Sequence, residues 1–235
     1  MTAATSDRGG LIFAAEPAPR LPVRNSELLF PVHRVYCVGR NYREHAEEMG
    51  MSPREPPFFF SKPADAIFTG TSMPYPPETS SLHHEAELVV ALGGGGMNIQ
   101  PDRALALVMG YSVGVDLTRR DLQAEAKQNG RPWTTAKGFD RSAPVSAIRS
   151  VAAGGHPQNA AISLSVNGEV RQRGNTGDMT WSVPEIIAEL SRYFELKAGD
   201  LIFTGTPSGV GPVVPGDHID CEIETVGSLS FQVTG

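Results

Sequence analysis

An acidic pair at the start of an apolar run constrains the fold of this chain more than any other feature. The segment His83–Leu92 reads HHEAELVVAL and is followed by four glycines. Its β-branched and apolar residues are typical of a buried strand. Alternate side chains of a strand share a face, so Glu85 and Glu87 are predicted to point the same way. Two buried carboxylates repel each other and lose solvation, so they stay ionised only with a cation between them.

A third acid follows another apolar run. Asp116 lies near the end of Tyr111–Leu117, which is predicted to be a neighbouring strand. Three carboxylates are hard oxygen ligands that suit Mg²⁺ or Mn²⁺, and they leave about three octahedral positions for water or a chelating substrate. In the alternative interpretation, Glu85 and Glu87 line a solvated edge and bind lysine or arginine. The residue pattern by itself leaves both interpretations open.

Composition and charge narrow the classes of function. The chain has 235 residues, of which 40% are hydrophobic and 20% charged, as in an ordinary globular protein with one sizeable core. A net charge of −6 argues against nucleic acid or an anionic membrane as the main partner. Only two cysteines occur, Cys37 and Cys221, which favours a reducing cytoplasm, and no apolar run approaches the ~20 residues of a membrane helix. We expect an N-terminal arm over residues 1–30 and a single catalytic domain over residues 31–235.

Helix signals place further polar residues. Asn41 is predicted to cap a short helix, Tyr42–Met49, in which His45 and Glu48 face the same side because they stand three residues apart. A His-Glu pair with this spacing most often lies on the protein surface without a functional role. Further elements are indicated by a proline near the first helical position, by capping pairs and by an Asn-Gly turn. They are a helix over 101–109, a helix capped by Thr118 with Asp121, a loop over 133–140 containing Lys137, a hairpin over 162–173 turning at Asn167-Gly168, and a helix from Ser182 to about Leu196 with Glu185 in its capping box.

Two other motifs do not support a different chemistry. The stretch Gly205–Gly211 is glycine-rich, but it lacks the Lys-Ser/Thr pair of a phosphate-binding P-loop. Cys37 lies within the apolar strand predicted over 32–39, where a small buried thiol is more common than a nucleophile. A thiol hydrolase based on Cys37 therefore ranks last among the alternatives.

Several segments together resemble the fumarylacetoacetate hydrolase family. Their order and spacing agree with the family from about Leu21 to the C-terminus, and the arm over 21–32 is also similar to its fumarylpyruvate hydrolase subgroup. The resemblance implies a mixed α/β, strand-rich fold of the β-sandwich or roll type with short flanking helices, and a homodimer. The segments that carry it are Cys37–Tyr42 with His45 and Glu48, Phe60–Pro63, His84–Leu88, Gly114–Gln123, Ala136–Lys137 and Thr204–Gly211.

The resemblance also assigns expected roles to individual residues. Glu85, Glu87 and Asp116 become the ligands of Mg²⁺ or Mn²⁺, which matches the interpretation from charge. His45 and Glu48 become the dyad that activates water, and Lys137 the cation beside the developing negative charge. The expected substrate contacts are Lys62, Gln123, Gly205 and Thr206, with Arg40 or Arg43 at a distal carboxylate; for either arginine a surface salt bridge is an equal alternative.

The implied reaction is hydrolysis of the C–C bond of an acylpyruvate, a 2,4-diketo acid, with fumarylpyruvate giving fumarate and pyruvate in aromatic-ring degradation. One alternative keeps the metal and changes the reaction to decarboxylation of oxaloacetate or isomerisation of a related 2-keto diacid. Another is a non-catalytic metal- or ligand-binding protein on the same scaffold. The joint presence of His45, Glu48 and Lys137 argues against that binding protein.

Overall fold

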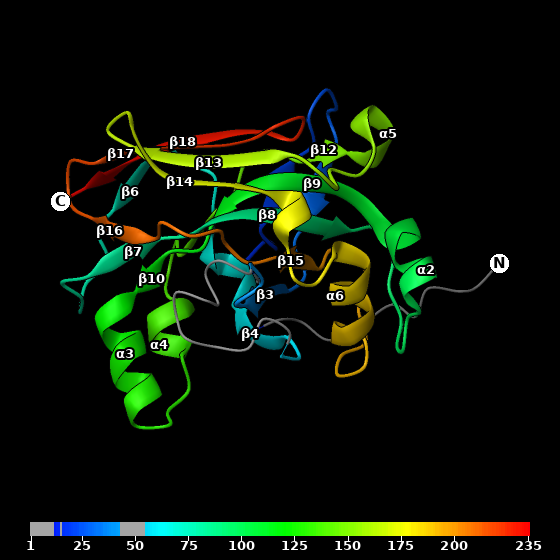
Figure 1. The fold of residues 1–235 in the computed structure, drawn as a ribbon, viewed down its shortest axis with the longest axis horizontal. Coiled ribbons are helices and arrows are strands. Elements are labelled where there is room, and N and C mark those ends of the chain that lie inside the picture. Colours follow the sequence, from blue (N-terminus) through cyan, green and yellow to red (C-terminus); the bar gives the residue numbers. More distant parts are fainter. Residues whose placement is uncertain (1–11, 15, 43–54) are drawn as a thin grey trace.

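Two sheets packed face to face form the centre of the molecule (Figure 1). The structure is a computed structural model, and it describes residues 12–14, 16–42 and 55–235. Strands predominate among these residues, which confirms the predicted mixed, strand-rich class. The larger sheet has the strand order β12 (Arg149–Ser150), β9 (Val108–Val115), β8 (Ala86–Leu92), β15 (Leu201–Phe203), β3 (Val35–Gly39) and β4 (Phe58–Lys62).

The second sheet contains the predicted hairpin. Its order is β14 (Glu169–Asn175), β13 (Ala161–Val166), β17 (His218–Ile223), β18 (Gly227–Thr234) and β6 (Ser72–Pro74). Strands β13 and β14 are antiparallel and turn at Asn167 and Gly168, whose φ angles are 54° and 81°. Two successive positive φ angles are required by a type I′ turn, which explains why the Asn-Gly pair predicted this hairpin correctly.

The main core lies between the two sheets, and strand β8 is buried on both faces. Leu88, Val90 and Leu92 face the second sheet within this core, whereas Val89 and Ala91 belong to a second cluster on the opposite face. Glu87 has the parity of Val89 and Ala91, so its side chain lies on the opposite face of β8 from the main core. The alternation of the strand thus separates the carboxylates from the main core.

Smaller strand pairs surround the two sheets. Leu21 and Phe30, in the expected N-terminal arm, are buried in the second cluster, so this part of the arm packs on the domain. The division at residue 30 stays a prediction. The smaller sheets consist of β10 (Thr118–Arg119), β7 (Leu82–His84) and β16 (Gly211–Val213) in one sheet, β1 (Arg20–Pro22) with β2 (Leu29–Pro31), and β5 (Ile67–Phe68) with β11 (Ala143–Pro144).

The helices are short and lie around the sheets (Figure 1). Among the described residues, no helix is long and apolar enough to cross a membrane. The α-helices are α2 (Pro101–Ala104), α3 (Arg120–Gln128), α4 (Thr134–Lys137), α5 (Val151–Gly154) and α6 (Val183–Leu190), and 3₁₀ turns cover Ala64–Ala66, Leu105–Leu107 and Thr176–Asp178.

The predicted capping box at Ser182 and Glu185 opens α6, but the helix ends at Leu190 rather than near Leu196. The residue that follows is held by another segment: the carbonyl oxygen of Ser191 accepts the Asn98 N–H, and its hydroxyl oxygen accepts the Ile99 N–H. These tertiary contacts end the helix at a point that the local sequence does not mark.

Three other predicted elements are corrected. The helix over 101–109 is shorter, because Val108 already pairs with Leu92 in the larger sheet. Thr118 is not a helix cap but pairs with His83 in β10, and α3 begins only at Arg120. The expected loop over 133–140 contains helix α4, with Lys137 as its last residue.

Candidate active site

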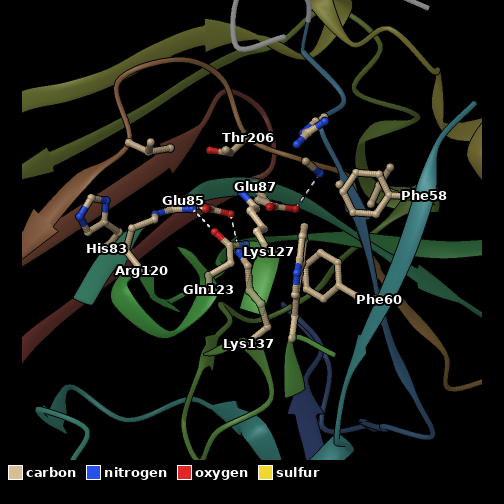
Figure 2. A pocket seen from close by; sticks show the side chains of 16 residues that line it. Phe58, Phe60, His83, Glu85, Glu87, Arg120, Gln123, Lys127, Lys137 and Thr206 are labelled. Carbon is tan, nitrogen blue, oxygen red and sulfur yellow. Dashed lines mark hydrogen bonds and ion pairs between the residues drawn. The ribbon is translucent and has the colours of Figure 1, made fainter. Parts of the chain in front are cut away.

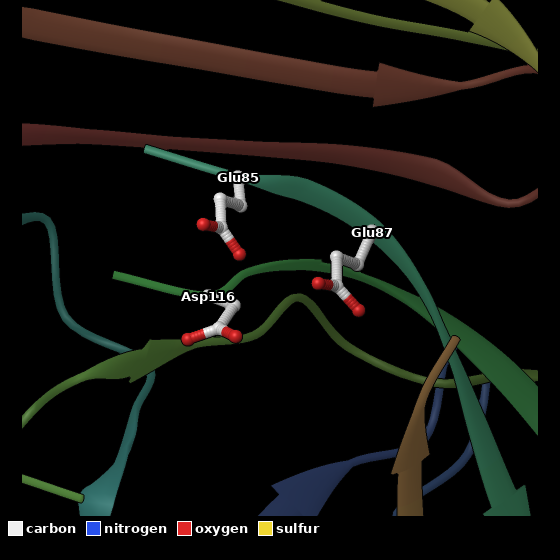
Figure 3. Close-up of side chains that lie close together, drawn as sticks. All are labelled: Glu85, Glu87 and Asp116. Carbon is white, nitrogen blue, oxygen red and sulfur yellow. The ribbon is translucent and has the colours of Figure 1, made fainter. Parts of the chain in front are cut away.

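The three predicted acids meet in one buried cluster. Glu85 lies between β7 and β8, Glu87 lies within β8, and Asp116 directly follows β9, the strand that pairs with β8. The Asp116 N–H donates to the Glu85 carbonyl at 2.8 Å, which fixes the two strand ends side by side. One carboxylate oxygen from each residue lies within 4.8 Å of the others (Figure 3). We call Glu85, Glu87 and Asp116 the acidic triad.

Cations surround the acidic triad. Lys137 Nζ lies 2.8 Å from an oxygen of Glu85 and 2.8 Å from an oxygen of Asp116. Lys62 Nζ lies 2.8 Å from the other Asp116 oxygen, and Arg120 Nη2 lies 2.5 Å from Glu85. We call Lys62, Lys137 and Arg120 the three paired cations. The acids therefore do bind lysine and arginine, but in a buried cluster and not along a solvated edge.

The charges of the triad are unequally compensated. Burial alone would raise the pKa of Glu85, but Lys137 and Arg120 more than offset it and hold that pKa well below the usual value. For Glu87, burial and then repulsion from Asp116 and Glu85 raise the pKa well above the usual value. Within the described residues, the three paired cations contact Glu85 and Asp116, and none of them forms an ion pair with Glu87. A divalent cation fits this donor set, because hard carboxylate oxygens are the ligands that Mg²⁺ and Mn²⁺ prefer.

A pocket of about 300 Å³ opens beside the triad (Figure 2). It combines acids and cations at one end with an aromatic wall, in which the rings of Phe58 and Phe60 have their centres 5.4 and 5.8 Å from that of Trp133. The lining residues are Val38, Gly39, Arg40, Phe58, Phe60, His83, Glu85, Glu87, Arg120, Gln123, Lys127, Trp133, Lys137, Gly205, Thr206 and Val210.

The loop after β15 forms another side of the pocket. The Gly205 N–H donates to Glu87 Oε2 at 2.7 Å, with Gly205 at a φ of +97°. A Cβ atom at this position would lie 2.7 Å from the Cβ of Asn41, so both the conformation and the space require glycine. Asn41 Nδ2 donates to the Thr204 carbonyl at 2.8 Å and holds the loop in place.

Most predicted site residues are brought together. Lys137, Gln123, Gly205, Thr206 and Arg40 line the pocket with Glu85 and Glu87. Lys137, 2% exposed, has its ammonium directed at the acids, and its predicted role beside the developing negative charge stays a prediction. His45, Glu48 and Arg43 lie outside the residues that the structure describes, so their predicted roles stay predictions.

Lys62 is the exception to this convergence. Its side chain is buried and does not line the pocket. Its ammonium binds Asp116 and donates to the carbonyl oxygens of Leu117 and Lys137. Lys62 thus holds one end of the acidic triad, and its predicted contact with substrate stays a prediction.

Other polar residues at the site were missed by the sequence analysis. Arg120 donates to Gln123 Oε1 at 2.7 Å and to Glu85, and Lys127 lines the pocket one helical turn beyond Gln123. The spacing of these three residues in α3 was the available signal, because positions i, i+3 and i+7 share a helix face. Gln172, on β14, donates to the Thr206 hydroxyl at 2.8 Å, and no local pattern indicated that contact.

Cys37 is fully buried in the second core cluster. Burial, and then the charge of Asp116, raise the pKa of this thiol well above its usual value. Because the thiolate is the reactive form, this environment disfavours a nucleophilic role.

Comparison with known proteins covers nearly the whole chain and identifies its family. The model of the fumarylacetoacetate (FAA) hydrolase C-terminal domain matches residues 34–234. The chain belongs to the fumarylacetoacetate hydrolase family. This finding confirms the resemblance and, with the strand arrangement, the expected fold class.

Similar proteins in this family include some named for fumarylpyruvate and some named for oxaloacetate. A fumarylpyruvate hydrolase of a Ralstonia species is 44% identical over 180 residues, covering 76% of this chain and 93% of that protein. An oxaloacetate tautomerase of Escherichia coli is 44% identical over 192 residues, covering 81% of this chain and 88% of that protein. The crystal structure of fumarylpyruvate hydrolase from Pseudomonas aeruginosa in complex with Mn²⁺ and pyruvate has a TM-score of 0.94 and 49% identity, covering 96% of this chain and 99% of that one.

Proposed function

We propose that this protein hydrolyses the C–C bond of an acylpyruvate, with fumarylpyruvate as the best candidate substrate, in a reaction that depends on Mg²⁺ or Mn²⁺. The observation that carries the proposal is the buried acidic triad, with Lys137 bound to two of its members, beside a pocket of about 300 Å³. Similarity to a fumarylpyruvate hydrolase with Mn²⁺ and pyruvate supports it.

The charge around the acidic triad supports a dianionic substrate. When ionised, the acidic triad carries three negative charges, which equal the positive charges of the three paired cations. A divalent ion held by the triad would leave this cluster with a charge of +2. Fumarylpyruvate and oxaloacetate are both dianions at neutral pH, so complementary charge favours this class of ligand over neutral compounds.

The described residues supply binding and charge stabilisation. A divalent ion bound to the triad would act as a Lewis acid toward a 2-keto acid and its enolate. Lys137 places an ammonium beside that position, where it stabilises the negative charge of the departing pyruvate enolate. Because Arg120 donates to Gln123 Oε1, the amide N–H₂ of Gln123 is left to donate to substrate.

Thr206 contributes a second polar group. Its hydroxyl oxygen accepts a hydrogen bond from Gln172, so its own O–H can turn to a substrate oxygen in the pocket. Proton transfer from water is assigned to His45, polarised by Glu48, on the basis of the family resemblance alone. A positioned base of this kind contributes roughly 10²–10⁴-fold to the rate.

Tautomerisation or decarboxylation of oxaloacetate is the second candidate. The 44% identity to an oxaloacetate tautomerase favours it, and an enolate stabilised by Lys137 serves those reactions too. The two candidates differ at one step, since only hydrolysis needs an attacking water. His45→Ala should therefore abolish hydrolysis while sparing an oxaloacetate reaction that needs no water.

The deciding experiment follows the loss of the ultraviolet absorbance of fumarylpyruvate, with Mg²⁺ or Mn²⁺ and again after EDTA, beside an oxaloacetate reaction. Metal-dependent release of fumarate and pyruvate, faster than conversion of oxaloacetate, is the expected result. Rapid conversion of oxaloacetate without cleavage of fumarylpyruvate would replace the first candidate by the second. Metal binding without turnover of either compound would leave a binding protein.

Assembly and setting are proposed on sequence grounds. We propose a homodimer in the cytoplasm that acts in aromatic-ring degradation, as the family resemblance and the absence of a disulfide framework suggest. The molar mass in solution, from light scattering, tests the dimer.

A further inference from the structure

Lys127 is a pocket cation that forms no ion pair with any acid among the described residues. It lies at the exposed rim of the pocket on helix α3, and Figure 2 shows it with Gln123 among the lining side chains. Within the described part of the chain its ammonium makes no ion pair; its one contact is with the Trp133 ring, whose centre is 5.2 Å away. By contrast, Lys137 and Arg120 in the same pocket are each bound to Glu85.

The helix spaces three polar side chains along the pocket. Arg120, Gln123 and Lys127 stand at positions i, i+3 and i+7 of α3 and so share one face. With a rise of about 1.5 Å per residue, the Cα atoms of Arg120 and Lys127 lie roughly 10 Å apart along the axis. Because Arg120 is bound to the acidic triad, Lys127 is the residue of these three whose backbone position along α3 is farthest from Arg120 and its contact with the triad.

This spacing suits a long diacid better than a short one. The carboxyl carbons of an extended seven-carbon diacid lie about 7–8 Å apart, whereas those of a four-carbon diacid lie about 4 Å apart, given C–C bonds near 1.5 Å. The rings of Phe58, Phe60 and Trp133 provide a wall of the same pocket for a flat conjugated chain. Lys137 Nζ lies 5.2 Å from the centre of the Phe60 ring, and Lys127 Nζ lies 5.2 Å from the centre of the Trp133 ring.

We propose that Lys127 binds the far carboxylate of an extended 2-keto diacid whose keto-acid end lies at the acidic triad, and that it thereby favours long over short diacids. The inference rests on the proposed function in one respect, that the triad end of the pocket receives a 2-keto acid. It adds a specificity-determining residue that differs from the arginines expected from sequence.

The electrostatic environment agrees with an anion at this position. Partial burial, followed by repulsion from Arg120 and Arg40, lowers the pKa of Lys127. A carboxylate bound to Lys127 would offset this repulsion. Arg40 also lines the pocket, with its guanidinium carbon 5.7 Å from the centre of the Phe58 ring, and supplies further positive charge to the same anion.

The test compares the binding of two probes that cannot be cleaved. 2-Oxoheptanedioate and 2-oxoheptanoate have the same chain length and no 4-keto group, and only the first has a far carboxylate. Their dissociation constants are measured by calorimetry in the presence of Mn²⁺, for the wild type, Lys127→Met and Lys127→Arg. Lys197→Met is the matched control, because Lys197 is an exposed lysine that does not line the pocket.

In the wild type, the diacid should bind more tightly than the monoacid. Lys127→Met should weaken the diacid about tenfold, as expected for loss of a charge-assisted hydrogen bond, and leave the monoacid within about twofold. Lys127→Arg should retain the preference, and Lys197→Met should change neither constant. Equal weakening of both probes by Lys127→Met, unchanged diacid binding, or no preference in the wild type would each overturn the inference.

Failure of the proposed function can be distinguished from failure of this inference. A wild type that prefers the diacid probe through Lys127 but does not cleave fumarylpyruvate keeps this inference and discards the hydrolase. A wild type that cleaves fumarylpyruvate with no loss of diacid binding in Lys127→Met keeps the hydrolase and discards the inference. A wild type that binds neither probe overturns the inference, because it requires a 2-keto acid at the triad.

Discussion

The ion pairs of Lys137 allow a quantitative prediction for the variant Lys137→Met. The ammonium lies 2.8 Å from both Glu85 and Asp116 and 2.6 Å from the Thr118 hydroxyl oxygen, and all of these residues are buried. Methionine has a similar length and an apolar body, so the substitution removes mainly the charge and its hydrogen bonds. Two buried carboxylates then lose one cationic partner each.

The size of the effect follows from the partners that remain. Removal of one member of a buried ion pair costs about 3–5 kcal/mol. Glu85 keeps Arg120 and Asp116 keeps Lys62, so we expect the lower end of that range. A loss of about 3 kcal/mol in a chain of this size corresponds to a fall in melting temperature of roughly 6–12 °C.

The assay is thermal unfolding followed by circular dichroism, in EDTA at pH 7.5. Lys127→Met is the matched control, because it makes the same substitution at a lysine of the same pocket that forms no ion pair with the other described residues. Its free energy of unfolding should change by no more than about 0.5 kcal/mol. Mn²⁺ should then raise the melting temperature of Lys137→Met more than that of the wild type, since the ion replaces positive charge that the variant lacks.

Two results would refute this reasoning. If Lys137→Met lost no more stability in EDTA than Lys127→Met, the acids would be balanced by Lys62 and Arg120 alone, and the contacts of Lys137 would contribute little. If Mn²⁺ stabilised the wild type and the variant equally, the ammonium and the metal would not share the same carboxylates.

Three further predictions concern other groups. Glu87→Gln should weaken Mn²⁺ binding at least about tenfold, measured by titration with electron paramagnetic resonance. The free energy of unfolding in EDTA should stay the same or rise slightly, because the negative charge that the substitution removes is repelled by Asp116 and Glu85. Hydrogen bonds from the Thr79 hydroxyl and nearby N–H groups outweigh partial burial and lower the pKa of Asp121. A lowered carboxyl pKa stabilises the fold above the unfolded pKa, and this effect is lost as pH falls through the folded pKa. Asp121→Asn should therefore cost stability in denaturant titrations at pH 7 and progressively less as the pH is lowered below the unfolded pKa. Cys37 and Cys221 are buried with raised pKa values, so neither should react with a disulfide reagent at pH 8 until the protein is unfolded in urea; rapid reaction of one thiol in the folded protein would revive the thiol mechanism.

Local chemistry explains which elements could be predicted from the sequence. The Asn167-Gly168 turn and the capping box at Ser182 depend on a few adjacent residues, and both form as expected. The convergence of Glu85 and Glu87 follows from the two-residue period of a strand. Asp116 could be placed with them because its strand was correctly predicted to be a neighbour of theirs.

The errors arise where distant segments override local preference. Thr118 and Asp121 have the spacing of a capping box, but Thr118 pairs with His83, and its hydroxyl is committed to Lys137. The ion pair of Lys62 with Asp116 and its hydrogen bond to the carbonyl oxygen of Lys137 also join distant segments, and they were not predicted. Contacts of this kind cannot be read from the residues on either side.

The two kinds of relative differ in the length of the diacid in their names, and the pocket suggests where such a difference is read. A 2-keto acid end is common to oxaloacetate and fumarylpyruvate, so the acidic triad and Lys137 can serve both. Discrimination between these two substrates must then come from groups that a four-carbon chain bound at the triad does not reach. Helix α3 provides such a group at Lys127, while its first residue, Arg120, holds Glu85. One short helix thus connects the alignment of a candidate metal ligand with the selection of substrate length.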